Sequence, residues 1–292
     1  MSKVRAFARN WVLRGKDIAL SPLWSTVWSK HLEFLWFDTK NWGDALNPVL
    51  IEKLSKAKAK GVDINLRLLE PLAQDPEDRT LYMVIGSVMQ YADCQTVIWG
   101  AGFTSNYNQF RQPPKKILAV RGPLSADHSR SMGVECPDIY GDPALLWPRY
   151  YQPKVKKRYK LGIIPHHLER NDPILKQFME SPEVLFIDIK TSIDKLVDLV
   201  CSCERIASSS LHGLILSDAY NIPSGWIGIS DKIPGKDFKF KDYYASIGLP
   251  ELEKTNLQAL GSQIAAAQQL YDLCQEHELK IDLDRLMEVC PF

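Results

Sequence analysis

The sequence predicts an α/β protein of two Rossmann-like domains that face each other across a cleft, an arrangement like that of GT-B enzymes. Apolar runs alternate with helical patterns through most of the 292 residues, which is typical of parallel sheets covered by helices. The stretch 149–160 is polar, basic and without apolar periodicity. We therefore place a linker there and expect an N-terminal domain over 1–150 and a C-terminal domain over 151–292.

In the first half, buried strands are predicted from continuous apolar runs at 33–38, 64–69, 81–87, 96–102 and 116–123. A helix is expected after the first strand, with Asp44 as its cap, and Ser125 is placed to cap the helix that follows the fifth run.

The second half repeats this alternation, with strands predicted at 160–167, 184–190, 205–210 and 224–230. Helices are predicted at 172–181, 192–203 and 211–221, the first capped by Asp172 with proline at its first position. A strong helical repeat covers 256–279, and this C-terminal helix is long enough to pack back across the domains.

Composition excludes several classes of protein. Hydrophobic residues make up 45% and charged residues 24%, as in a globular protein, and a net charge of +1 gives no global attraction to nucleic acid. The six cysteines form no C-x-x-C pair, which argues against a zinc cage or a redox pair. We expect free thiols in a reducing cytosol, and no metal or cofactor.

The N-terminus carries a local positive bias. The segment 1–16 holds five lysines and arginines, no acids and several interleaved apolar residues. Such a segment can lie on an anionic membrane surface, and the alternative is a docked or frayed terminus with solvated charges. No apolar run reaches the roughly 20 residues that a membrane span needs. We expect a cytoplasmic protein, peripheral on the inner face of the membrane under the first alternative.

Candidate site residues of the first half follow the predicted strands, because ligands of open α/β sheets bind at the carboxyl ends. Asn41, Gly43 and Asp44 follow the first strand, where glycine permits close approach of a ligand and the helix start offers free N–H groups. The alternative is a glycine turn with an aspartate cap. Small residues at two further junctions, Gly86, Ser87 and Gly100, leave room for a ligand, although glycine spacing of this kind is a weak signal.

Two charged residues end later strands of this half. The planar guanidinium of Arg121 suits a carboxylate or a phosphate in the cleft, and the alternative is an ion pair with an acid. Asp142 is equally consistent with a structural cap and a functional carboxylate.

In the second half, His166 and His167 end the first strand, with Arg170 close by. Adjacent histidines point in different directions, so we expect one to face the cleft and no shared metal. The D-x-D of Asp282 and Asp284 lies in an amphipathic segment and is interpreted as surface.

The stretch "ASSSLHGLILSDAYNIPS" places Ser208, Ser209, Ser210, Leu211, His212 and Gly213 between a strand and a helix. The helix dipole disfavours an imidazolium at this position, whereas a bound multiply charged anion would raise the pKa of His212. Such a histidine can bind an anion and donate a proton. The alternative is a capping or packed histidine.

The motifs "NWGDALNP", "RGPLS", "GDPALLWP" and "SSSLHGLILSDAYNIP", in this order, resemble the polysaccharide pyruvyltransferase family over about residues 40–226. The resemblance implies a GT-B-like fold and transfer of pyruvyl from phosphoenolpyruvate to a sugar of a glycan or lipid-linked oligosaccharide, giving a ketal and phosphate. Some members have arginine where this chain has Ser210. Arg170, Lys232 and Lys236 are candidates to replace that cation.

On this resemblance, His212 is expected to bind the donor and protonate its methylene carbon, with Arg121 reaching across the cleft. Asp44, Asp142 or His166 would deprotonate the acceptor hydroxyl. Two alternatives stay open. One is a GT-B glycosyltransferase that uses a nucleotide sugar, and the other is a non-catalytic glycan-binding protein.

Overall fold

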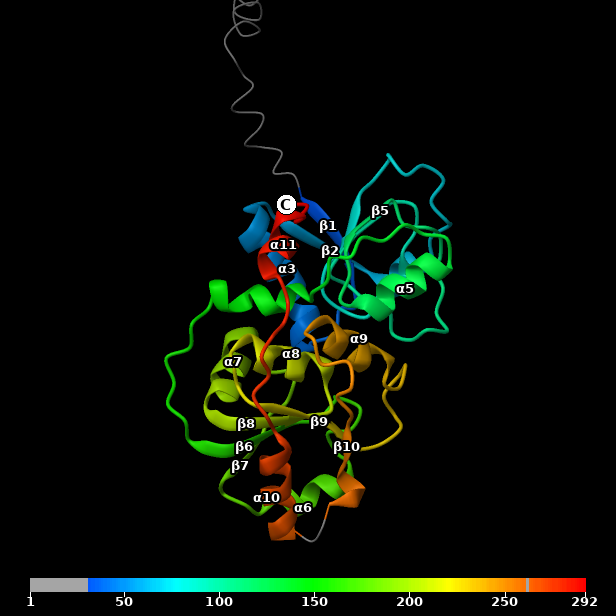
Figure 1. Cartoon of the computed structure of the whole chain (residues 1–292). Coiled ribbons are helices and arrows are strands. Elements are labelled where there is room, and N and C mark those ends of the chain that lie inside the picture. Colours follow the sequence, from blue (N-terminus) through cyan, green and yellow to red (C-terminus); the bar gives the residue numbers. More distant parts are fainter. Residues whose placement is uncertain (1–30, 261–262) are drawn as a thin grey trace, which may run out of the picture.

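The computed structural model describes residues 31–260 and 263–292, and it confirms an α/β fold with two five-stranded parallel sheets (Figure 1). The first sheet has the order β2-β1-β3-β4-β5, with β1 Leu32–Trp36, β2 Ala59–Asp63, β3 Leu81–Met83, β4 Thr96–Trp99 and β5 Lys116–Ala119. The second has the order β10-β9-β8-β6-β7, with β6 Tyr159–Ile164, β7 Val184–Phe186, β8 Cys203–Ser208, β9 Ser224–Gly228 and β10 Thr255–Asn256.

Both sheets follow one topology. In each half, the first strand lies between the second and the third, so that the chain reverses its direction of winding between β1 and β3 and again between β6 and β8. Ligands of doubly wound sheets bind beyond the carboxyl ends of the strands at such switch points. The segments that follow these four strands are therefore the places to look for a site.

Helices connect the strands. In the first half they are α3 Trp42–Ser55, α4 Ile64–Arg67, η1 Met89–Tyr91, α5 Pro123–Ser131 and η2 Pro143–Arg149. In the second half they are η3 Pro173–Leu175, α6 Lys176–Met179, α7 Ile193–Cys201, α8 Leu211–Ala219, α9 Phe238–Ser246, η4 Leu257–Ala259, α10 Gln263–Leu273 and α11 Leu283–Glu288. Asp172 caps η3 through the Ile174 N–H, as predicted.

Three local predictions were wrong. The run 64–69 begins a helix rather than a strand, because the Asp63 carboxylate accepts the N–H groups of Asn65 and Leu66 and caps α4. The cap of α3 is Asn41, which leaves Asp44 in the first turn. The cap position of α5 is Gly122 and not Ser125.

The two halves share part of their core. One buried cluster lies within the first half and one within the second. A third joins Trp42 and Leu46 of α3 to Leu196 of α7 and Leu214 of α8. The starts of α3 and α8, which belong to different halves, are thereby held next to each other. The boundary between residues 150 and 151 stays a prediction.

The C-terminus returns to the first half, although not through the predicted helix. The repeat over 256–279 contains α10, which packs on α6 within the second half. The chain then runs back as the red segment of Figure 1 to α11. There Trp99 Nε1 donates to the Leu286 carbonyl at 2.9 Å, and the Phe292 ring lies 5.0 Å from that of Tyr82.

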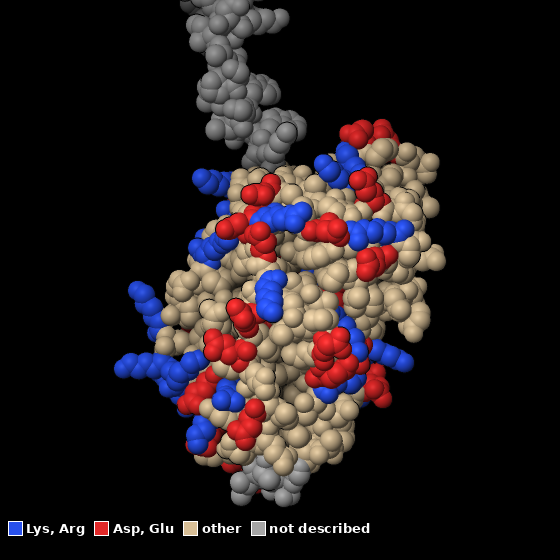
Figure 2. Space-filling view, in the orientation of Figure 1, with Lys and Arg blue, Asp and Glu red and all other residues tan. Residues whose placement is uncertain are grey.

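On the face shown in Figure 2, lysines and arginines are interspersed with acidic residues, so neither charge predominates there. The two aspartates of the D-x-D sequence stabilise α11, since Asp282 caps the helix and Asp284 forms an ion pair with Arg149 at 2.8 Å. The basic segment 1–16 lies outside the described residues. Within 31–260 and 263–292, no helix combines the length and the apolar character that crossing a bilayer requires.

Candidate active site

A cavity of about 520 Å³ lies where the two switch points meet. Its walls come from the segments after β1, β3 and β4 of the first half and after β6, β8 and β9 of the second. The predicted site residues that line it are Asn41, Asp44, Ser87, His166, Ser210, Leu211 and His212. The structure therefore brings together residues from both halves of the chain in one pocket.

His212 is joined to the first half by a hydrogen bond. Its Nδ1 lies 2.9 Å from Asn41 Oδ1, and the same oxygen accepts the Gly43 N–H at 3.2 Å. An oxygen in this position requires the proton of the imidazole to be on Nδ1. The tautomer assigned from this hydrogen bond leaves Nε2 with its lone pair free.

Gly43 permits this contact. A Cβ at this position would stand 2.3 Å from the ring of His212, a separation that real Cβ atoms do not show. The glycine therefore lets the first turn of α3 approach the imidazole across the two halves. This role differs from the predicted contact with substrate.

Three imidazoles line the pocket, those of His166, His167 and His212, although one alone of the adjacent pair was expected to face the cleft; the rings of His166 and His167 lie 4.3 Å apart. Burial lowers the pKa of His212 to about 3, and the charges of Lys239 and Arg121 lower it further. Burial likewise lowers the pKa of His166 to about 3, again with Lys239 as the largest charge contribution. The lowered pKa of His212 agrees with the neutral state expected for it, and burial is the largest cause.

Lys239, which the sequence analysis missed, lines the same pocket. Among the described residues its ammonium has no hydrogen-bond or ion-pair partner, and it lies 5.5 Å from the ring centroid of Phe240. Burial lowers the pKa of Lys239 to about 8, and Arg121 lowers it further, whereas Asp44 and Glu169 raise it. A desolvated cation without a hydrogen-bond or ion-pair partner is the property expected of an anion site.

The three cations considered from the sequence lie elsewhere. Arg170 faces Asp188 at 3.7 Å, and Lys232 faces Asp172 at 3.4 Å. Lys236 is exposed and lines a neighbouring cavity. None of the three lines the pocket that contains His212.

Asp44 adds a titratable acid. Thr39 Oγ1 donates to its Oδ2 at 2.5 Å. Burial raises the pKa of Asp44 to about 6, against the opposing effects of the Thr39 hydrogen bond and the charge of Lys239. A carboxyl group with this pKa can exchange a proton near neutral pH.

The three serines have different roles. Ser208 Oγ lies within hydrogen-bond distance of the Ile164 and Ser210 carbonyls and accepts the Ser210 N–H, and Gly213 leaves the space that its hydroxyl fills. Ser209 donates to the buried Glu169 at 2.7 Å. Both hydroxyls therefore stabilise the loop between β8 and α8. Ser210, the N-cap of α8, lines the pocket, and its hydroxyl has no partner among the described residues.

The structure corrects the expectation that Arg121 points into the cleft. Its side chain is fully buried, and Nε and Nη2 lie 3.0 and 2.8 Å from Asp242 Oδ2. Nη1 donates to Ser87 Oγ at 2.7 Å, and Nη2 donates to the Phe103 carbonyl at 2.8 Å. The guanidinium thus stands behind the wall of the pocket, in the acid-paired arrangement that the sequence left as the alternative.

The remaining predicted residues lie off the pocket. Asp142 caps η2 by accepting the Ala144 N–H at 3.0 Å, and burial raises its pKa to about 7. Gly86 and Gly100 have φ of 123° and 93°, so they serve turns that favour glycine. At Gly100 a Cβ would also collide with Pro143.

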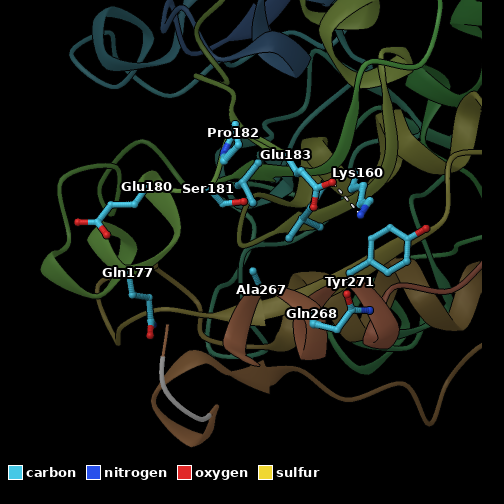
Figure 3. A pocket seen from close by; sticks show the side chains of 11 residues that line it. Lys160, Gln177, Glu180, Ser181, Pro182, Glu183, Ala267, Gln268 and Tyr271 are labelled. Atoms are coloured by element: carbon cyan, nitrogen blue, oxygen red, sulfur yellow. Dashed lines mark ion pairs between the residues drawn. The ribbon is translucent and has the colours of Figure 1, made fainter. Parts of the chain in front are cut away.

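A separate cavity of about 440 Å³ lies between α6 and α10, at the amino ends of β6 and β7 (Figure 3). Its side chains include Gln177, Gln268 and the ion pair of Lys160 with Glu183 at 2.7 Å. None of the predicted site residues lines it. We therefore assign the candidate active site to the pocket that contains His212.

Comparison with known proteins agrees with the sequence motifs. The model of the polysaccharide pyruvyl transferase family matches residues 41–231. An uncharacterized protein of Acanthamoeba polyphaga mimivirus is 30% identical over 72% of this chain and 71% of its own. The succinoglycan biosynthesis protein ExoV of Rhizobium meliloti is 27% identical over 65% of this chain and 61% of its own, so less than two thirds of that relative is spanned.

Among solved structures, an uncharacterized protein of Klebsiella pneumoniae has 12% identity and a TM-score of 0.43 over 82% of this chain and 98% of its own, too low a score to relate the two folds. The family match is different, because it covers well over half of the chain and includes the residues after β1, β6 and β8 that meet in the pocket. The chain belongs to the polysaccharide pyruvyl transferase family.

Proposed function

We propose that the protein transfers a pyruvyl group from phosphoenolpyruvate to a sugar of a polysaccharide or lipid-linked oligosaccharide, giving a pyruvate ketal and phosphate. The observation that carries the proposal is Lys239, which has no hydrogen-bond or ion-pair partner among the described residues, in a pocket with His212, His166 and Asp44. Family membership supports pyruvyl transfer in general. The donor and the ketal chemistry are part of the proposal, as is the GT-B-like placement of the two halves.

The second half supplies the donor side. Lys239 offers a positive charge, and the N–H groups of Leu211 and His212 at the start of α8 have no partner among the described residues. The Ser210 hydroxyl adds a further donor. Phosphoenolpyruvate carries a phosphate and a carboxylate on a small frame, and these groups together can bind both.

The proton balance assigns roles to the titratable groups. The methylene carbon of the donor gains a proton, and the adjacent carbon forms bonds to two sugar oxygens while its bond to the phosphate oxygen breaks. Of the two protons lost by the sugar hydroxyls, one balances that gained by carbon and the other leaves with phosphate. Donor binding raises the pKa of His212, so Nε2 can carry the proton to carbon. Asp44, or His166, accepts the proton of the attacking hydroxyl.

The first half supplies the acceptor side. Its wall holds Phe37 and Tyr91, whose rings are 5.4 Å apart, and the amides of Gln90 and Asn108. Of the first-half residues that line the described pocket, Asp44 alone has a carboxylate, imidazole, ammonium or guanidinium group. Aromatic surface with neutral hydrogen-bonding groups suits an uncharged sugar ring. A lipid-linked acceptor would place the protein on the inner face of the membrane.

The test incubates the protein with phosphoenolpyruvate and a panel of sugar acceptors, with the ketal read by mass spectrometry and phosphate by a colour assay. Lys239→Met should raise KM for phosphoenolpyruvate roughly tenfold to 100-fold, as expected for loss of a charged hydrogen bond. Lys236→Met is the matched control, because Lys236 is exposed and does not line the pocket, and it should change KM less than twofold.

Two results would overturn the proposal. Thermal stabilisation and turnover with nucleotide sugars but not with phosphoenolpyruvate would indicate a glycosyltransferase. Glycan binding without phosphate release from any donor would indicate a binding protein.

A further inference from the structure

Asp242 belongs to the second half but is bound by the first. It is fully buried on α9, and its carboxylate accepts Arg121 Nε at 3.0 Å and the Ser125 hydroxyl at 2.7 Å through Oδ2. Its Oδ1 accepts the Ser125 N–H at 2.9 Å. All these partners lie at the end of β5 or the start of α5.

The carboxylate of Asp242 completes the cap of α5. The cap residue of this helix is Gly122, which has no side chain, and the Ser125 N–H is one of the free donors of the first turn. A carboxylate at this point also interacts favourably with the helix dipole. A Cβ on Gly122 would stand 1.9 Å from the Asp242 carbonyl oxygen, so α9 packs directly on the start of α5.

Lys239 lies three residues before Asp242 on the same helix, α9. Residues with this spacing share one side of a helix. Among the described residues the ammonium of Lys239 has no hydrogen-bond or ion-pair partner to fix its position, and burial makes its charged form unfavourable. Its location in the pocket therefore depends on the position of α9, and Asp242 is the residue of α9 that forms an ion pair with the first half.

We propose that Asp242 and Arg121 form a latch between the two halves that positions Lys239 for the donor. The latch also contacts the wall that the first half contributes to the pocket, because Arg121 Nη1 donates to Ser87 Oγ at 2.7 Å. Arg121 and Asp242 are positioning residues that do not touch substrate. The inference rests on the proposed role of Lys239 as the donor anchor.

The test is Asp242→Asn, with Asp93→Asn as its matched control. Asp93 forms the chain's other buried arginine pair in the described residues, with Arg67 Nη2 at 2.7 Å, and neither residue lines the pocket. Both variants should lower Tm, because each removes a buried carboxylate from an arginine. Only Asp242→Asn should raise KM for phosphoenolpyruvate, by roughly tenfold or more, with kcat at saturating donor reduced less than threefold.

Gly122→Ala is the second variant, and it leaves both charges of the latch in place. The added methyl displaces α9, so this variant should raise KM for phosphoenolpyruvate in the same way. If Asp242→Asn does not fold, the KM of Gly122→Ala tests the proposal in its place. An unchanged KM in folded Gly122→Ala and Asp242→Asn, with KM raised in Lys239→Met, overturns the latch alone. An unchanged KM in Lys239→Met overturns the donor anchor and the latch with it.

Discussion

Gly43→Ala should inactivate the protein through His212 without harming the fold. The new Cβ would stand 2.3 Å from the ring, whereas ordinary van der Waals contact begins at 3.4 Å. The ring or α3 must therefore move by about 1 Å, and the 2.9 Å hydrogen bond to Asn41 is stretched or lost. Misplacement of a catalytic group by about 1 Å lowers turnover on the order of 100-fold.

Stability separates this effect from simple damage. Gly43 is in the first turn of α3, where alanine is intrinsically better than glycine by up to about 1 kcal/mol. The assay is steady-state phosphate release, with Tm measured on the same samples. In a His212→Ala background, Gly43→Ala should have no further effect, because the two residues act as one unit. Turnover within threefold of the unchanged protein, or an equal loss in the His212→Ala background, would refute the reasoning.

Three further predictions concern pH, a buried acid and the C-terminus. The rate at low donor concentration should fall above about pH 8, because Lys239 has a pKa of about 8 and loses its charge there. Lys239→Arg should remove this fall in rate at high pH. A fall that persists in Lys239→Arg would mean that another group titrates. Asp142 has a folded-state pKa of about 7, above its unfolded value of about 3.9, so ionisation destabilises the fold as pH rises through this range. Asp142→Asn should therefore raise stability to urea at pH 8 but not at pH 4, with turnover retained; loss of turnover would restore a catalytic role. Deletion of residues 283–292 should speed hydrogen exchange in β4, since Trp99 loses the Leu286 carbonyl; unchanged exchange would contradict this.

The sequence predicted the parts of the site that follow from local pattern. The residues after β1, β6 and β8 were found because apolar runs identify strands, and strand ends identify ligand positions. Four motifs in one order then indicated the family, which the comparisons show.

Pairings between distant residues could not be predicted. Arg121 lies behind the pocket because an acid 121 residues later in the chain binds it, and nothing near Arg121 indicates this. Lys239 lies beyond residue 231, where the family match ends, and its lowered pKa comes from burial by both halves. The error at 64–69 arose because Asp63, a helix cap, precedes an apolar run that resembles a strand.

The return of the C-terminus has a consequence for biosynthesis. Leu286 is part of the core cluster that contains Phe34 and Trp99 of the first sheet, and the Phe292 ring packs on Tyr82 and Trp99. A ribosome makes Leu286 187 residues after Trp99, an interval of roughly 10–40 s at about 5–20 residues per second. The strands of the first sheet are therefore made well before the segment that completes their core. The first half can finish its packing only after nearly all of the second half has been made.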